Sequence, residues 1–421
     1  AFYDTPWLTN KQKGNNSLVI VNGILIDGTT CSGEVTIPDG VTSIGNSAFY
    51  DCSSMTSINI PKSVTSIGNG AFYNCTGLTS INIPENVTSI GNGAFQRCSK
   101  LASINIPDGV KSIEDNAFYE CTELTGITIP ESVTSIGKYA FYKCTGLTSI
   151  EIPEGVTSIG DYAFSGCGNL TEVLLEGGSK LTSENFGEVA NKVVTYWNEG
   201  DLTWTLAADG TLTISGTGAM TEYYGSDNSP AYDNSKIKKV VIENGITSIG
   251  AYAFSGCNKL ASIEIPEGVT SIGNYAFYNC SSLTSIEIPS SVTSIGNSTF
   301  SWCKNLTSIN IPKGVTSIGR YAFQNCTGLT SITIPKSVIS IGEFAFYNCT
   351  GLTSIEILEG VTSIGEYAFD SCNKLASITI PSSVTSIGYR AFSDTLWLTN
   401  KQQDNPLVIV NGILIDGTTC S

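Results

Sequence analysis

The chain has 421 residues, and 37 acidic against 21 basic side chains give it a formal net charge of −16. An acidic chain without a basic block lacks the positive surface that nucleic acids and anionic lipids require, so neither is an expected partner. Histidine is absent, which excludes Ser-His-Asp and Cys-His nucleophiles and imidazole metal sites. No segment approaches the ~18 apolar residues of a membrane span, so no membrane insertion is expected.

The segment at the start of the chain recurs at its other end. Residues 18–32 are identical to residues 407–421, and Trp7 corresponds to Trp397. This repetition predicts that the chain was cut from a longer protein with a super-repeat of roughly 390 residues. The first array of repeats is therefore expected to start, and the second to end, in the middle of a repeat.

Cysteines mark a regular period between these two ends. Twelve of the fourteen recur every 23 residues in two series, from Cys52 to Cys167 and from Cys257 to Cys372. A fixed period of this length is typical of a solenoid, in which each coil covers the apolar face of the next.

One repeat illustrates the features that recur. Leu78, Ile81 and Ile83 have the L-x-x-L-x-L spacing of leucine-rich repeats. The alternation predicts a short strand with the isoleucines pointing inward and Asn82 pointing outward. Pro84 lacks an N–H group and is expected where the strand ends.

The second half of the same repeat predicts a return segment. Val87 and Ile90 indicate another short extended piece on the opposite side of the coil. Gly91 is expected to supply a turn with positive φ. A single helical turn over Ala94–Cys98 is expected to direct Phe95 into the core.

The full pattern, L-x-x-I-x-I-P-x-x-V-x-x-I-G-x-x-A-F-x-x-C, resembles the BspA-type (Treponema pallidum-type) leucine-rich repeats. It covers Cys31 to Leu175 and Ile237 to Leu398, and twelve units carry the cysteine. We therefore predict a mainly β, right-handed leucine-rich repeat solenoid with short helical turns and a continuous parallel sheet. The resemblance implies a bacterial, exported protein displayed at the cell surface, where several members of the family are adhesins.

The repeat pattern is interrupted in the middle of the chain. Two alternating runs, 202–206 and 211–214, flank Asp209-Gly210 and predict a β-hairpin. We interpret residues 197–236 as a cap and joint between a first array, residues 1–196, and a second array, residues 237–421.

The cysteines themselves are more typical of core packing than of chemistry. Neighbouring repeats would bring them within disulfide range, but buried cysteine behaves as a small hydrophobe. There is no C-x-x-C spacing, so no zinc or other metal site is expected. Cys31 and Cys420 lie outside the regular series, and their redox state is left open.

Two columns of residues are candidates for a binding surface. The first consists of polar residues on the outward side of the strands: Asn59, Asn82, Asn105, Glu264 and Glu287. The alternative is a solvated sheet surface. The second is an aromatic stripe just before the Ala-Phe pair: Tyr252, Tyr275, Tyr321, Phe344 and Tyr367. The alternative is that these rings stack on one another and shield the turns.

We therefore expect a noncatalytic, extracellular or cell-surface protein that needs no cofactor and acts as a monomer. Its partner is expected to be an extracellular protein, either host matrix or another cell's surface, held by many weak contacts along a repeated face. A polysaccharide-binding accessory or spacer of a secreted carbohydrate-active protein is the alternative. Glycan binding would depend on exposed rings, whereas protein adhesion would use the polar strand surface.

Overall fold

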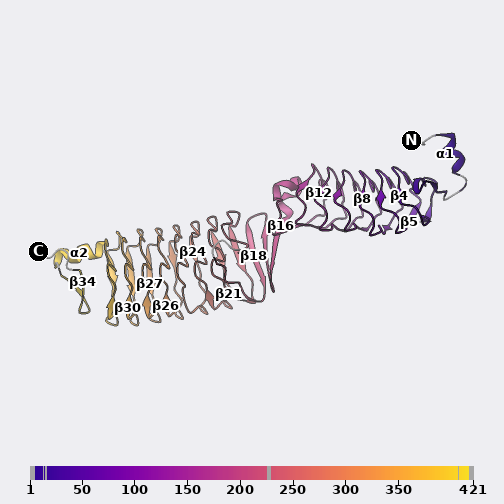
Figure 1. Cartoon of the computed structure of the whole chain (residues 1–421). Helices are drawn as coiled ribbons and strands as arrows, with labels where there is room; N and C mark the ends of the chain where they lie inside the picture. The colour runs from indigo at the N-terminus through magenta and orange to yellow at the C-terminus, as the bar shows by residue number, and fades with distance from the viewer. Residues whose placement is uncertain (1–4, 13, 15–16, 225–228, 406, 417–421) are drawn as a thin grey trace. The chain divides into compact units, whose positions relative to one another are not determined.

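The computed structural model describes residues 5–12, 14, 17–224, 229–405 and 407–416. It divides into two compact units, Ala1–Tyr196 and Trp197–Ser421. Each unit is a mainly β solenoid of stacked coils with little helix (Figure 1), which confirms the predicted fold class. The role of residues 197–236 as a cap between two arrays stays a prediction.

Each coil of the first unit contributes one strand to a main ladder. These strands run parallel, and equivalent residues of successive repeats lie opposite one another. They are β3 (Gly33–Thr36), β5 (Met55–Asn59), β7 (Ser80–Ile81), β9 (Ser103–Asn105), β11 (Gly126–Thr128), β13 (Ser149–Ile152), β15 (Glu172–Glu176) and β16 (Val193–Glu199). Hydrogen-bonded pairing runs from β3 to β11 and again from β13 to β16.

The predicted return segment forms a second ladder in the first unit. It is also parallel, with Ile44, Ile67 and Ile90 in register. Its strands are β2 (Ile24–Asp27), β4 (Ser43–Ile44), β6 (Ser66–Ile67), β8 (Ser89–Ile90), β10 (Ser112–Ile113), β12 (Ser135–Ile136) and β14 (Ser158–Ile159).

Three elements of the first unit fall outside these ladders. Helix α1 (Pro6–Lys11) precedes β1 (Val19–Val21), which pairs antiparallel with β2. The 3₁₀ helix η1 (Ser183–Lys192) lies between β15 and β16 and is kinked at Gly187. After β15, therefore, the chain stops repeating the regular coil.

The second unit begins with the predicted hairpin. Strands β17 (Leu202–Ala207) and β18 (Thr211–Gly216) pair antiparallel. Strand β18 then pairs in parallel with β20 (Lys239–Ile242), and β20 with β22 (Ser262–Glu264). The main ladder continues through β24 (Ser285–Ile286), β25 (Ser308–Ile309), β27 (Ser331–Ile334), β29 (Ser354–Ile357) and β31 (Ser377–Thr379).

A second ladder runs along this unit as well. Its strands are β19 (Gly218–Ala219), β21 (Ile246–Ile249), β23 (Ser271–Ile272), β26 (Ser317–Ile318), β28 (Ser340–Ile341), β30 (Ser363–Ile364) and β32 (Ser386–Ile387). Helix α2 (Leu396–Asp404) and the hairpin of β33 (Val408–Val410) and β34 (Ile413–Asp416) follow the last repeat. None of the helices described here combines the length and hydropathy that crossing a membrane would need.

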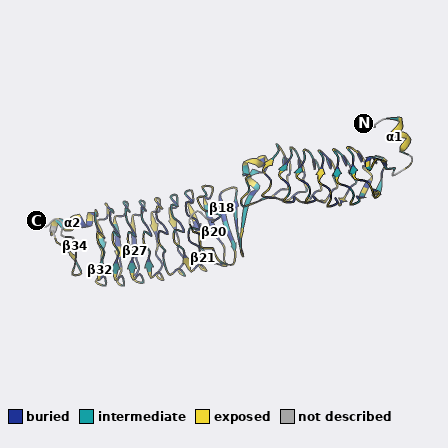
Figure 2. Cartoon of the chain, in the orientation of Figure 1, coloured by how far each residue is buried: buried dark blue, intermediate teal, exposed yellow. Residues whose placement is uncertain are grey.

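A column of phenylalanine rings forms the centre of each unit. In the first unit, Phe72 stacks between Phe49 and Phe95, with ring centroids 5.2 and 5.3 Å away. In the second, Phe323 lies 5.4 Å from Phe300 and 5.1 Å from Phe346. All six rings are fully buried. Buried and exposed residues alternate around each coil as Figure 2 shows, so stacking of repeats creates the core.

The glycine that follows each return strand has a different role from the predicted one. Gly91 does not have a positive φ. A Cβ at this position would lie 2.6 Å from the backbone N of Asn69 and 2.8 Å from the carbonyl carbon of Gly68, in the preceding repeat. The prediction of a positive-φ turn is therefore wrong. At Gly91 two backbones approach too closely for a side chain, whereas the equivalent position of the next repeat holds Glu114.

The segment before each cysteine forms successive tight turns in place of the predicted helical turn. The N–H groups of Ala94 and Cys98 donate to the carbonyls three residues earlier. The intervening N–H groups of Gly93, Phe95 and Arg97 donate to the next repeat, with N···O distances of 2.7 to 2.9 Å. Because alternate donors point out of the segment, a helix cannot form, and Gly93 and Arg97 have positive φ.

Candidate functional site

The outward residues of the main ladder form an exposed polar surface, which we call the strand face. In the first unit it includes the predicted Asn59, Asn82 and Asn105, all of which are exposed. The isoleucines on either side of Asn82 are buried, as the alternation predicted. Among the described residues, no side-chain hydrogen bond joins these three asparagines to one another. Their amides are thus available to a ligand.

The strand face of the second unit carries carboxylates at the same positions. The predicted Glu264 and Glu287 are both exposed. The Nζ atom of Lys239 lies 2.6 Å from an Oε atom of Glu264, so this carboxylate is partly neutralised. Glu356 lies between Thr333 and Thr379 in the register of β27, β29 and β31.

A shallow hollow runs along the strand face of the second unit over five repeats. Its volume is about 690 Å³. Its lining includes no lysine or arginine and combines hydroxyl, amide and carboxylate groups with four isoleucines. The polar residues are Ser285, Glu287, Ser308, Asn310, Ser331, Thr333, Ser354, Glu356, Ser377 and Thr379, and the isoleucines are Ile286, Ile309, Ile332 and Ile355. The structure thus brings Glu287 together with polar groups of four other repeats.

A second hollow adjoins the first at the edge of the strand face. It has a volume of about 500 Å³ and is lined by both Glu264 and Glu287. Lys313 is the one basic residue of this lining, which also includes Glu267. The two hollows share Glu287 and Asn310. An acidic, hydrogen-bonding surface therefore extends along most of the second unit.

The predicted aromatic stripe is present, but its rings lie against one another. Tyr252 and Tyr275 stack with centroids 4.6 Å apart. Tyr321, Phe344 and Tyr367 stack at 4.9 and 4.7 Å. All five rings are half-buried. Stacking leaves little free ring face for a sugar or another ligand.

Two features divide and cover the stripe. Ser298 occupies the stripe position between Tyr275 and Tyr321, so the stripe consists of two separate stacks. The guanidinium of Arg320 lies 4.8 Å from the ring centroid of Tyr321 and pairs with Glu343. Burial raises the pKa of Tyr252, and the neighbouring Tyr275 adds to the effect. A binding role for the stripe stays a prediction.

The cysteines pack in the core as predicted, since all the described ones are buried. Each thiol of the regular series points at the backbone of the preceding repeat. The Sγ–H of Cys326, for example, donates to the carbonyl oxygen of Phe300 at 3.1 Å. Burial raises the pKa of Cys167 to about 11 and that of Cys303 to about 12. Cys31 is also buried, whereas Cys420 lies outside the described residues.

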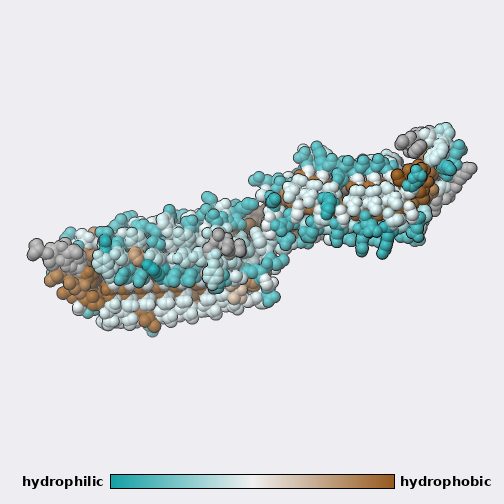
Figure 3. Space-filling view, viewed as in Figure 1, coloured by the Kyte–Doolittle hydropathy of each residue, from teal (hydrophilic) through white to brown (hydrophobic). Residues whose placement is uncertain are grey.

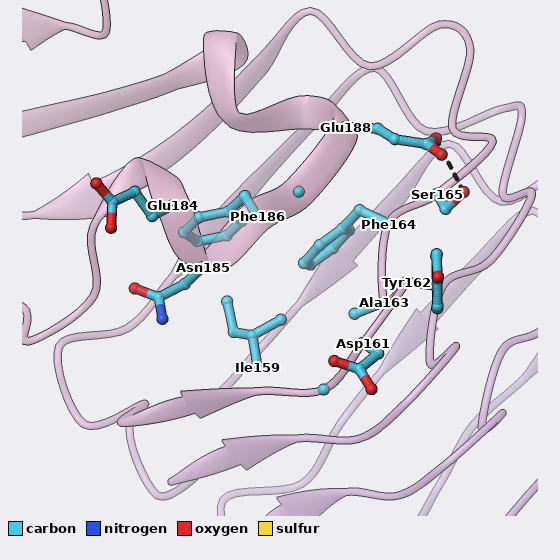
Figure 4. Close-up of a pocket in the computed structure, with 12 residues that line it drawn as sticks. Ile159, Asp161, Tyr162, Ala163, Phe164, Ser165, Glu184, Asn185, Phe186 and Glu188 are labelled. Atoms are coloured by element: carbon cyan, nitrogen blue, oxygen red, sulfur yellow. Dashed lines mark hydrogen bonds between the residues drawn. The ribbon is translucent and has the colours of Figure 1, made fainter.

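A cleft in the first unit was not predicted from the sequence. It lies between the last regular repeat and η1, has a volume of about 550 Å³, and is shown in Figure 4. Phe164 and Phe186 lie at its base, with Glu184, Asn185 and Glu188 on one side and Asp161 and Tyr162 on the other. The loss of the Ala-Phe-x-x-Cys pattern after Cys167 was the signal that could have located it.

In the view of Figure 3 both units are mostly polar to neutral, with a row of apolar side chains along the second unit and an apolar patch near the N-terminal end of the first. Figure 3 shows apolar side chains gathered at the C-terminal end of the second unit, where Leu407, Ile409 and Leu414 are exposed. The two hollows of the strand face are lined by polar groups above a row of isoleucines. A partner of the strand face must therefore supply hydrogen bonds and charge.

Comparison with known proteins agrees with this repeat architecture. The model of a family described as "BspA type leucine rich repeat region" matches residues 27–121, 111–191, 228–326 and 293–410. No curated protein is similar enough to this chain to count as a relative.

Several solved structures are similar to the chain. A leucine-rich repeat protein from Bacteroides ovatus is 30% identical over 82% of this chain and 85% of its own, with a TM-score of 0.38. A leucine-rich cell surface protein from Faecalibacterium prausnitzii is 33% identical over 82% and 94%, with a TM-score of 0.33. The leucine-rich repeat protein of T. pallidum is 28% identical over 42% and 90%, with a TM-score of 0.35.

Proposed function

Since the chain belongs to the family of BspA-type leucine-rich repeat proteins, we propose that it is a noncatalytic adhesin of a bacterial surface. In this proposal the solenoid is a rigid scaffold, and the strand face binds a protein of the extracellular matrix or of another cell. The proposed location outside the cell is supported by the cell surface protein from F. prausnitzii, to which the chain is similar.

The observation that carries the proposal is the hollow over five repeats of the second unit. A recess that spans β24 to β31 offers the same hydroxyl positions repeatedly, with Glu287 and Glu356 near its two ends. Repeated weak contacts on one rigid surface add up, because the first contact raises the effective concentration for the next. Such a surface suits a protein partner with an extended contact area.

The charge of the strand face specifies the partner further. Glu264, Glu287 and Glu356 are exposed on it, and Lys239 pairs with the first of these. The whole chain has a formal net charge of −16, which adds a long-range negative field. We therefore expect a partner with a basic surface, and binding that weakens as salt screens the charges.

The glycan alternative has less support in the structure. Sugar binding of the kind expected from the sequence needs open ring faces, and Tyr275 and Tyr321 are half-buried in stacks. Substituting both residues by Ala would test this alternative. If the chain retains polysaccharides and this variant does not, the function is glycan binding through the rings.

The test of the adhesin proposal is binding of the chain to an array of matrix proteins, mucins, and plant and microbial polysaccharides. We expect saturable binding to a protein on this array. The double variant Glu287→Lys/Glu356→Lys reverses two charges in the hollow and is expected to weaken that binding at least tenfold, a loss of ~1.4 kcal/mol.

The matched control is Glu85→Lys/Glu366→Lys, which reverses two exposed charges outside the strand face. It is expected to bind as tightly as the unmodified chain. Equal loss in the double variant and the control would mean that net charge alone matters. Unchanged binding in the double variant would overturn the assignment to the strand face. If the chain binds no member of the array, a spacer function would be favoured.

A further inference from the structure

The regular repeats are joined by three backbone hydrogen bonds at their turns. In the repeat before the cleft, the N–H groups of Tyr139, Phe141 and Lys143 donate to carbonyl oxygens of the next repeat. The N···O distances are 3.1, 2.8 and 2.8 Å. Because the donors are spaced two residues apart, they form an edge like that of a strand, and the following coil normally covers it.

In the last regular repeat of the first unit this edge is open. The equivalent donors are the N–H groups of Tyr162, Phe164 and Gly166. Within the described part of the chain, none of the three has a hydrogen-bond acceptor, although the alternating N–H groups of Ala163 and Ser165 form the usual turn bonds. The reason is that η1 takes the place of the next coil, and its side chains pack against this repeat without its backbone carbonyls pairing with these donors.

Two residues of the open edge, Tyr162 and Phe164, line the cleft between this repeat and η1, and Gly166 follows directly after the lining residue Ser165. Phe164 is almost fully buried, and its ring stacks on that of Phe186 with centroids 5.9 Å apart. Tyr162 is 57% exposed, and Ile159 completes the apolar part of the lining. Backbone donors that lack partners beside apolar rings are costly unless a ligand or water supplies acceptors.

The rim of the cleft is acidic. Asp161, Glu184 and Glu188 are exposed lining residues, and the lining includes no lysine or arginine. Ser165 donates to Glu188 at 2.9 Å, and Lys138 reaches Asp161 from the preceding repeat at 3.7 Å. The cleft therefore combines hydrogen-bond donors on its wall with negative charge on its rim.

We propose that this cleft binds an extended peptide segment that carries an arginine or lysine side chain. The carbonyl oxygens of the segment accept hydrogen bonds from the N–H groups of Tyr162, Phe164 and Gly166. In repeats that another regular coil follows, carbonyl oxygens of that coil accept the equivalent bonds. The cationic side chain of the segment reaches the exposed rim carboxylates of Glu184 and Glu188. The site is separate from the strand face and does not depend on the adhesin proposal.

In the last repeat of the second unit a helix covers the ring at the end of the stack, although the backbone donors of the edge stay without acceptors among the described residues. These donors are the N–H groups of Arg390, Phe392 and Asp394. There, helix α2 places Trp397 5.0 Å from the ring of Phe392, and Trp397 is buried. In the first unit η1 leaves a cleft of about 550 Å³ at the corresponding place.

The test uses the intact chain and a fluorescein-labelled, acetylated Ala-Arg-Ala-Arg-Ala amide. We expect saturable binding by fluorescence anisotropy. The variant Glu184→Gln/Glu188→Gln is expected to bind at least tenfold more weakly, whereas Glu85→Gln, an exposed carboxylate of another repeat, leaves the affinity unchanged. The peptide with Glu in place of Arg should bind at least tenfold more weakly. Equal binding of both peptides, or of the Glu184→Gln/Glu188→Gln variant, would overturn the proposal.

Hydrogen exchange tests the backbone contacts. Exchange at the amides of Tyr162, Phe164 and Gly166 should slow at least tenfold in the complex, and exchange at Tyr139 should not change. Binding without this protection would show that the peptide does not use the open edge. The strand-face variant Glu287→Lys/Glu356→Lys should bind the peptide normally, which separates failure of this site from failure of the adhesin proposal.

Discussion

A single buried cysteine illustrates how one residue serves the stack. The Sγ–H of Cys303 donates to the carbonyl of Phe277 in the preceding repeat at 3.2 Å, and the thiol is fully buried. A thiolate at this position would lose its hydration and the hydrogen bond that it donates. The pKa of Cys303 therefore rises from 9.0 to about 12. The thiol is a structural residue and a poor nucleophile.

This pKa shift predicts a loss of stability in alkali. A thiol whose pKa is higher in the folded chain keeps its proton longer than in the unfolded chain. Its contribution is fully present below pH 9 and is lost as the pH rises through the folded value. Between these limits each such thiol lowers the free energy of unfolding by about 1.4 kcal/mol per pH unit. Urea unfolding from pH 7 to 11 measures this effect.

We expect the urea midpoint to stay level from pH 7 to 8.5 and to fall steeply above pH 9. Thiol-specific reagents should label the native chain slowly at pH 8 and the urea-unfolded chain quickly. A midpoint that stays level up to pH 11 would contradict the prediction.

At the scale of one repeat against the next, the backbones approach so closely that side-chain size decides what fits. Gly91 follows strand β8 and lies against the backbone of Asn69 in the preceding repeat. Gly126, in strand β11, has open space where its Cβ would be. Neither residue has a positive φ, so the two positions differ only in the room available for a Cβ atom.

This contrast predicts opposite effects of the same substitution. Gly91→Ala should lower the free energy of unfolding by ~1–3 kcal/mol, because the methyl group forces the two repeats apart. Gly126→Ala should leave stability unchanged or raise it by ~0.4–1 kcal/mol, since it reduces the freedom of the unfolded chain. Thermal unfolding of the two variants measures both effects. Equal melting temperatures would show that the stack absorbs the extra methyl group.

At the scale of the whole molecule, each unit has its own hydrophobic core. One cluster runs from Leu25 to Val193 and the other from Leu202 to Val408. In a solenoid each repeat is stabilised mainly by its neighbours, so damage is expected to remain within the array that carries it.

Matched substitutions in the two phenylalanine columns test this independence. Phe72→Ala and Phe323→Ala each remove a fully buried ring from between two stacked neighbours, at a cost of ~3–5 kcal/mol. Calorimetry of the intact chain should show two unfolding transitions. Each variant should lower the temperature of one transition and leave the other in place. A single transition lowered equally by both variants would mean that the two cores unfold together.

The periodicity of the sequence was sufficient to predict the coil, because every repeat places the same apolar residues in the same positions. The inward Ile81, the outward Asn82, the return strand at Ile90 and the buried Cys98 all follow from a pattern of 23 residues. Repetition also showed the positions of the strand face and the aromatic stripe.

Features that depend on how closely one coil approaches the next could be determined only from the tertiary structure. The role of Gly91 depends on an atom of Asn69 in another repeat, and the tight turns before Cys98 depend on donors that bond to the following coil. The cleft beside Phe164 exists because η1 takes the place of the next coil. A local pattern determines which side chains point inward, whereas spacing between backbones arises only when the repeats pack together.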